Sequence, residues 1–237
     1  MSIGLTDSVV NIEENVKRVR DVIAQSAIKS GRTPGDITLV AAAKTKPAQM
    51  IRRAIEAGVD AIGENRVQEM LIKNTGEAYR GAPLHFIGHL QSNKVKNVVG
   101  LCDIIESVGS PELLALVGEK AVFKGIVQNV LIEINIGRER QKTGVIPERT
   151  EEMLDLASRT DGLMVLGLMT VPPINDKNDR NCNCFDAIHK LFVDMSAKKY
   201  DNVSMRFLSV GMSDSYPEAI LAGSNVVRIG SAIFGDR

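Results

Sequence analysis

Eight apolar runs alternate with seven segments of helical periodicity, and this alternation restricts the possible folds more than any other feature of the chain. The runs show little inside–outside alternation, which is typical of strands buried on both faces. Regular strand–helix alternation implies right-handed crossovers and a parallel sheet, and eight such strands predict a closed (β/α)₈ TIM barrel. The expected strands are 37–45, 61–65, 84–89, 103–108, 127–135, 163–171, 205–212 and 226–234.

Between these strands we expect helices at 47–57, 66–79, 93–99, 111–123, 147–160, 184–199 and 216–222, preceded by an extra N-terminal helix at 6–30. No residues remain after Phe234 for an eighth barrel helix, so we expect the N-terminal helix to fill that gap. The polar stretch 172–183 is expected to be a loop, so that residues 1–237 form a single domain. An open doubly wound sheet is the alternative, but no strand-to-helix turn carries G-x-G-x-x-G.

The amino-acid composition argues against several classes of protein. Lys+Arg and Asp+Glu are both 29, so the net charge is zero and a basic nucleic-acid-binding surface is not indicated. Three cysteines without disulfide-framework spacing suggest a reducing compartment. The N-terminus lacks a signal-peptide pattern, and no window of 18 apolar residues could span a membrane. We therefore expect a cytoplasmic protein.

The first strand ends in Ala43-Lys44-Thr45-Lys46-Pro47, which places a lysine at the mouth of the barrel, the usual active-site face of this fold. The simplest interpretation is a solvated side chain. A partly desolvated lysine, however, loses its proton more easily and can attack an aldehyde to form an imine. Lys44 is therefore a candidate for imine chemistry.

The last two strands indicate an anion site. The seventh ends in Gly211-Met212-Ser213-Asp214 and the eighth in Val227-Arg228-Ile229-Gly230-Ser231. Ser213 and Asp214 could simply cap the following helix. The loops after strands seven and eight are nevertheless the common phosphate site of these barrels, and an arginine within an apolar strand requires an acceptor.

Other motifs are weaker. His85 and His89 lie roughly 13 Å apart if both are on one strand, too far to share a metal ion. Cys182 and Cys184 have no second pair for a zinc site. Residues 137–144 fail the order of a phosphate-binding P-loop. No metal site is expected.

Pyridoxal 5′-phosphate (PLP) fits the combined pattern, with its aldehyde at Lys44, its phosphate at Ser213, Gly230 and Ser231, and its ring nitrogen near Arg228. An arginine there disfavours a proton on the ring nitrogen and weakens the ring as an electron sink. The pattern thus favours holding the cofactor, or restrained proton transfer, over decarboxylation.

The sequence resembles the pyridoxal phosphate homeostasis proteins, relatives of the N-terminal barrel of alanine racemase. Besides the motifs quoted above, the resemblance is carried by Gly63-Glu64-Asn65-Arg66-Val67-Gln68-Glu69, His85-Phe86-Ile87-Gly88-His89-Leu90-Gln91-Ser92-Asn93-Lys94 and Gly167-Leu168-Met169. It implies a fold-type III PLP-binding barrel that holds the cofactor as an imine on Lys44, with Asn65 beside it. From position alone, Asn65 could equally cap a helix.

The resemblance further implies a monomer without established catalytic turnover, which supplies or buffers the cofactor and supports amino-acid and keto-acid balance. Apo PLP-dependent enzymes are the expected recipients. The family usually has a more acidic or serine-rich loop where this chain has Arg138-Glu139-Arg140-Gln141, although Lys142 matches, and often a serine where Ala43 stands.

Two enzymatic alternatives stay open. A PLP-dependent amino-acid racemase would need a second acid/base group, which alanine racemases take from a separate C-terminal domain. Tyr79, Tyr200 and Tyr216 are the only tyrosines, and none is at an expected strand end. A class I aldolase-type enzyme acting on a sugar phosphate would use the same lysine and anion site.

Overall fold

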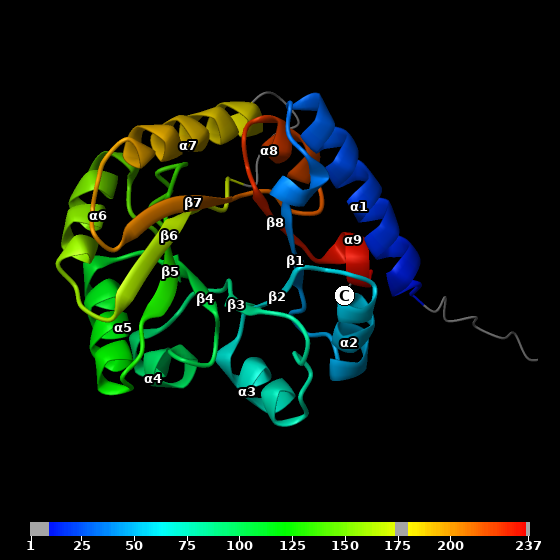
Figure 1. The fold of residues 1–237 in the computed structure, drawn as a ribbon, viewed down its shortest axis with the longest axis horizontal. Helices are drawn as coiled ribbons and strands as arrows, with labels where there is room; N and C mark the ends of the chain where they lie inside the picture. Colours follow the sequence, from blue (N-terminus) through cyan, green and yellow to red (C-terminus); the bar gives the residue numbers. More distant parts are fainter. Residues whose placement is uncertain (1–9, 174–179, 236–237) are drawn as a thin grey trace, which may run out of the picture.

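The computed structural model describes residues 10–173 and 180–235, and within them eight parallel strands close into a barrel (Figure 1). Each strand pairs with its neighbour in chain order, and the last strand pairs with the first. The TIM-barrel prediction is therefore confirmed and the open-sheet alternative is wrong. The strands are β1 (Thr38–Ala42), β2 (Ala61–Glu64), β3 (Leu84–Phe86), β4 (Ile104–Val108), β5 (Gln128–Glu133), β6 (Leu163–Met169), β7 (Val203–Ser209) and β8 (Val226–Ile229).

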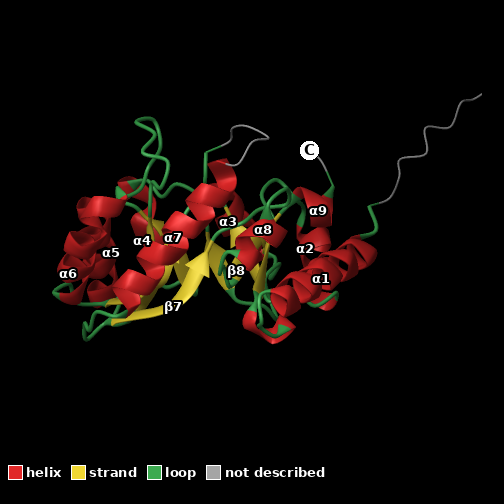
Figure 2. Ribbon diagram, turned by 90° about the horizontal axis from the view of Figure 1, so that it is seen from above, coloured by secondary structure: helices red, strands yellow, loops and turns green. Residues whose placement is uncertain are grey.

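The helices lie around the outside of the strands, as the two ribbon views show (Figures 1 and 2). Their apolar faces and the outward side chains of the strands form one continuous core. Short 3₁₀ turns at Pro34–Asp36, Ser92–Lys94 and Pro147–Arg149 join the elements. The helices are α1 (Ile12–Lys29), α2 (Ala48–Glu56), α3 (Val67–Thr75), α4 (Val95–Val98), α5 (Pro111–Phe123), α6 (Thr150–Ser158), α7 (Arg180–Ser196), α8 (Tyr216–Leu221) and α9 (Ser231–Phe234).

The end of the chain differs from the sequence expectation. Strand β8 stops at Ile229, and residues 231–234 form the short helix α9 instead of continuing the strand. The barrel therefore has a helix after its eighth strand, contrary to our expectation. Because α9 has only four residues, it covers little of the barrel wall.

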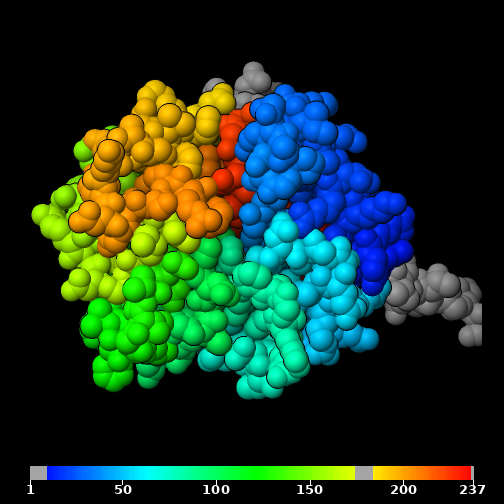
Figure 3. Space-filling model, in the orientation of Figure 1, coloured from blue at the N-terminus to red at the C-terminus, as the bar shows by residue number. Residues whose placement is uncertain are grey.

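Helix α1 covers the remaining wall, as predicted. It packs against α2, α8 and α9, and the Asn15 side chain donates to the Ile233 carbonyl at 2.9 Å. The helix begins at Ile12, where the Asn11 side chain accepts the Glu14 N–H, whereas its expected start at Thr6 lies outside the described residues. Figure 3 shows the resulting arrangement: successive segments follow one another around the molecule, and the blue segment adjoins the red one.

Parallel register gathers the predicted site residues at one end of the barrel. Ala42 pairs with Gly63, and Val40 pairs with Arg228, so the segments that follow these positions emerge side by side. The expected ends of strands one and seven were too late, because the chain leaves the sheet at Ala42 and Ser209. The loop expected at 172–183 is shorter on its C-terminal side, since α7 begins at Arg180, and residues 174–179 lie outside the described residues.

Gly167 is a position where β6 tolerates no side chain. Its φ is +147°, and a Cβ there would lie 1.9 Å from the Phe207 carbonyl oxygen on β7. Because backbone atoms cannot move aside without breaking the sheet, we expect Gly167→Ala to lower the free energy of unfolding by about 3 kcal/mol. Chemical denaturation measures this change.

Gly125→Ala is the matched control. Gly125 also has a positive φ, +67°, but no heavy atom lies within 4 Å of the position that a Cβ would take there. Only the backbone penalty remains, about 1 kcal/mol. Equal losses of stability in the two variants would contradict the steric argument.

Candidate active site

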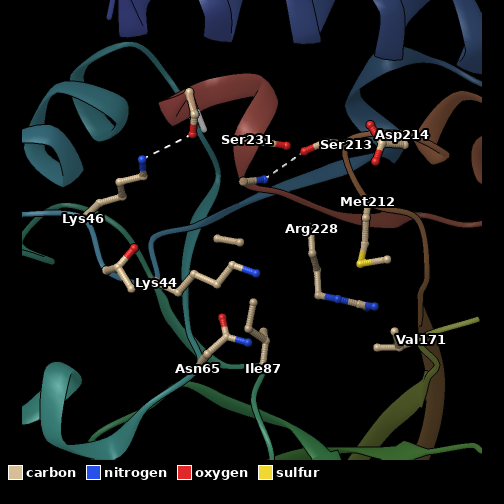
Figure 4. A pocket seen from close by; sticks show the side chains of 14 residues that line it. Lys44, Lys46, Asn65, Ile87, Val171, Met212, Ser213, Asp214, Arg228 and Ser231 are labelled. Carbon is tan, nitrogen blue, oxygen red and sulfur yellow. Dashed lines mark hydrogen bonds between the residues drawn. The ribbon is translucent and has the colours of Figure 1, made fainter. Parts of the chain in front are cut away.

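A cavity of about 470 Å³ opens at the carboxyl ends of β1, β2, β7 and β8 (Figure 4). A volume of this size suits a small organic molecule. The six residues proposed from the sequence all line it: Lys44, Asn65, Ser213, Arg228, Gly230 and Ser231. The structure thus brings together side chains from positions 44 to 231 of the chain.

Lys44 lies in the turn after β1, two residues beyond the end of the strand. Its half-buried side chain extends into the cavity (Figure 4). Among the described residues, its ammonium group makes no hydrogen bond and no ion pair. Lys46 points elsewhere and donates to the Phe234 and Gly235 carbonyls at 3.2 Å each. Both lysines line the cavity, but the Lys46 amine is occupied by these carbonyls, whereas the Lys44 amine extends into the cavity.

Ser213 joins the two segments of the expected anion site. Its hydroxyl accepts the backbone N–H groups of Gly230 and Ala232 at 3.3 Å each. It does not cap α8, whose N-cap residue is Ser215, so the helix-cap interpretation of Ser213 and Asp214 is wrong. The Gly230 and Ala232 N–H groups thus hold Ser213 at the start of α9, and the hydroxyls of Ser213 and Ser231 can donate to an anion there.

Asn65 follows β2 and faces the same cavity. It does not cap α3, because Arg66 occupies that position, so the capping alternative is wrong. Its side-chain oxygen is buried and has no hydrogen-bond partner in the described part of the chain. An unsatisfied buried oxygen is costly, and a ligand with a hydrogen-bond donor would satisfy it.

Arg228 reaches the cavity from inside the barrel, where it is only 5% exposed. Its guanidinium donates to the Ser209 hydroxyl and, at 2.8 Å, to the Thr170 carbonyl. It also lies 3.6 Å from the Glu106 carboxylate. The arginine is therefore held in place by these contacts, and the buried Glu106 carboxylate provides its counter-charge.

Sequence reasoning missed the network that holds Arg228. Glu106, which is fully buried on β4, accepts from Ser209 at 2.6 Å and lies 2.6 Å from His85 Nδ1. Burial alone would raise the pKa of Glu106, but the bond to His85 and the nearby Arg228 and Ser209 hold this pKa below its usual value. A glutamate inside the apolar strand 103–108 could have indicated this network from the sequence, because a buried charge needs a partner.

The remaining sequence candidates do not form a second centre. No group of three or more His, Cys, Asp or Glu side chains in residues 10–173 and 184–235 could hold a metal ion, and the Cys182 side chain lies outside these ranges. His85 and His89 separate, with His85 inside the barrel and His89 on the rim of another hollow. In the basic loop, Lys142 pairs with Glu139 at 2.6 Å and donates to the Pro172 carbonyl at 3.2 Å.

Comparison with known proteins agrees with this geometry. Residues 9–237 match the model of the family described as alanine racemase, N-terminal domain. The pyridoxal phosphate homeostasis protein of Aquifex aeolicus is 37% identical over 230 residues, covering 96% of this chain and 99% of that protein. The protein of the same name from Escherichia coli K12 is 36% identical, covering 96% and 97%.

Solved structures give the same result. PipY of Synechococcus elongatus, determined with PLP bound, matches with a TM-score of 0.82 and 26% identity, covering 95% of this chain and all of PipY. A crystal structure described as an unknown protein from Bifidobacterium adolescentis matches with a TM-score of 0.89 and 34% identity, covering 98% of this chain and all of that one. A Clostridium difficile alanine racemase at 15% identity shares the fold, with a TM-score of 0.73. The chain therefore belongs to the pyridoxal phosphate homeostasis proteins, within the alanine racemase N-terminal domain family.

Proposed function

We propose that this protein binds pyridoxal 5′-phosphate covalently at Lys44 and serves in the intracellular supply and buffering of the cofactor, and thereby in amino-acid and keto-acid balance, without robust catalysis of its own. The observation that carries the proposal is the cavity itself. Within the described residues, four kinds of group line it: an amine without a protein partner, hydroxyls that can donate hydrogen bonds to an anion, a side-chain amide oxygen without a partner and a buried guanidinium.

These groups match the functional groups of the cofactor one by one. PLP supplies an aldehyde, which condenses with a primary amine by forming a carbon–nitrogen double bond and releasing water. Lys44 provides that amine, while Ser213, Gly230 and Ser231 bind the phosphate. The side-chain oxygen of Asn65 accepts a hydrogen bond from a donor of the bound molecule or from a water molecule around it. Arg228 places a positive charge beside the ring nitrogen and disfavours a proton at that atom.

The relatives support the assignment. Proteins named for PLP homeostasis match nearly the whole chain, and PipY has been determined with PLP bound. None of the three tyrosines lines the cavity. The racemase and aldolase alternatives would use the same lysine and anion site, so it is the names of these relatives that favour supply and buffering of the cofactor.

Ser213→Ala tests the phosphate site. The change removes a hydroxyl that organises the Gly230 and Ala232 N–H groups, so we expect about tenfold weaker binding of PLP. Pyridoxine 5′-phosphate, which has the phosphate but no aldehyde, should lose a similar factor. Fluorescence or calorimetric titration measures both affinities.

Ser215→Ala is the control for this variant. Ser215 is in the same loop and accepts the Met212 N–H at 3.3 Å, but it does not line the cavity. Its affinity for both ligands should equal that of the wild type. If Ser213→Ala also binds both ligands normally, the phosphate assignment is wrong.

Delivery is tested by mixing the PLP-loaded protein with an apo PLP-dependent aminotransferase. We expect activity to recover, and placing a dialysis membrane between the two proteins shows whether recovery requires contact. A loaded protein that never activates the apo-enzyme would exclude the supply role while leaving a storage role. Efficient turnover of an amino acid or a sugar phosphate by the loaded protein would instead favour an enzymatic function.

We further propose that residues 1–237 act as one PLP-binding domain, as a monomer in the cytoplasm. Within the described residues, none of the helices has the length and apolar character needed to cross a membrane. Size-exclusion chromatography with light scattering tests the monomer.

A further inference from the structure

The turn that carries Lys44 is held from outside the cavity. Thr45, the next residue, has a φ of +62°, a left-handed conformation that is unfavourable for a β-branched side chain. Its backbone N–H donates to the Glu69 carboxylate at 2.8 Å. On the other side of Lys44, the Ala43 carbonyl accepts from the Lys73 ammonium at 3.0 Å. Both peptide groups that flank Lys44 are thus fixed by side chains of α3.

Those two side chains belong to one partly buried charge cluster. Glu69 and Lys73 are one helical turn apart on α3, and their charged atoms lie 3.7 Å from each other. Lys73 also lies 2.6 Å from Glu64, whose side chain is fully buried at the end of β2. The Tyr79 hydroxyl donates to the same Glu64 oxygen at 3.0 Å. The cluster is therefore anchored to the barrel wall.

The charges are arranged to keep Glu69 ionised. Burial alone would raise the pKa of Glu69, but the Thr45 N–H and the neighbouring Lys73 and Arg66 bring this pKa below its ordinary value. An ionised carboxylate is a stronger acceptor than a neutral one. It can therefore offset the cost of the left-handed conformation at Thr45.

From this geometry we infer that Glu69 and Lys73 are positioning residues, which set the direction of the Lys44 amine by fixing the turn around it. None of Glu64, Glu69, Lys73 and Tyr79 lines the cavity, so they act through the backbone and not by touching a ligand. The inference rests on the proposed function, in which Lys44 bonds to the aldehyde of PLP. Positioning matters for that bond and not for binding of the phosphate.

The test compares two ligands in Glu69→Ala. Loss of the Thr45 acceptor should weaken formation of the reducible PLP adduct, read from its absorption, by about tenfold. Affinity for pyridoxine 5′-phosphate, which cannot form the adduct, should stay unchanged. Glu69→Gln keeps an acceptor oxygen for the Thr45 N–H and should restore most of the adduct. The Glu69 side chain is 23% exposed, so either variant is expected to fold.

Glu152→Ala is the matched control, because it removes a glutamate of α6 that pairs with Arg149, three residues earlier in the preceding 3₁₀ turn. This variant should form the PLP adduct and bind pyridoxine 5′-phosphate as the wild type does. The positioning role is overturned if Glu69→Ala forms the adduct as well as the wild type does. It is also overturned if the variant loses affinity for pyridoxine 5′-phosphate by the same factor as it loses adduct formation. Absence of the adduct in wild type would instead overturn the proposed function, so the two failures are distinguishable.

Discussion

Lys44→Ala is expected to abolish the reducible visible absorption that the wild-type protein develops with PLP. The Lys44 amine extends into the cavity, and alanine offers no nucleophile in its place. Binding through the phosphate should persist at lower affinity, because Ser213, Gly230 and Ser231 are untouched. The measurement is an absorption spectrum before and after addition of borohydride.

Two further variants define what the loss means. Lys44→Arg keeps the positive charge but cannot form the bond, so it should also lack the absorption. Lys190→Ala removes a surface lysine that pairs with Asp194 at 2.6 Å on α7, and it should behave as wild type. A normal spectrum in Lys44→Ala would show that another lysine carries the cofactor.

Glu106→Ala is expected to lower the free energy of unfolding strongly. The change would leave the Arg228 guanidinium buried without its counter-charge and would remove the acceptor of His85 and Ser209. Removing one partner of a buried ion pair costs about 3 to 5 kcal/mol. Denaturant unfolding measures the change, and the exposed pair between Glu152 and Arg149 gives the contrasting case, where Glu152→Ala should cost less than about 1 kcal/mol.

Acid titration of stability gives a second readout for Glu106. Its pKa in the folded state is below the ordinary value of 4.5, so its ionised form contributes stability above that value. This contribution is lost as the pH falls below 4.5 and through the folded-state pKa. The wild type should therefore lose more stability on acidification than Glu106→Gln does. If the stability of the wild type and of Glu106→Gln depended on pH in the same way, Glu106 would not be ionised in this network.

Much of the fold was predictable because a barrel of this class repeats one simple pattern. Apolar strands buried on both faces and amphipathic helices differ in length and periodicity, so their order along the chain could be derived. Local signals also predicted which residues would meet at the cavity, since parallel strands bring their carboxyl ends to one face. Helix α9 was missed because Ser231–Phe234 continues the apolar run of β8, and periodicity does not resolve four residues.

The groups that support the site were not predictable from local patterns. Ser209 and Glu106 are 103 positions apart in the sequence, and their hydrogen bond depends on barrel closure. Likewise, Lys73 looks like an ordinary surface lysine of an amphipathic helix, although it contacts Ala43 and Glu64. Buried polar partners are selected by three-dimensional position, so sequence spacing alone does not reveal them.

The most direct measurement of the central claim is the location of the cofactor on the chain. The wild-type protein is incubated with PLP, reduced with borohydride and digested, and the modified peptide is identified by mass spectrometry. We predict one modification, on Lys44. Modification of Lys46, Lys142 or another lysine in place of Lys44, or no modification at all, would contradict the account.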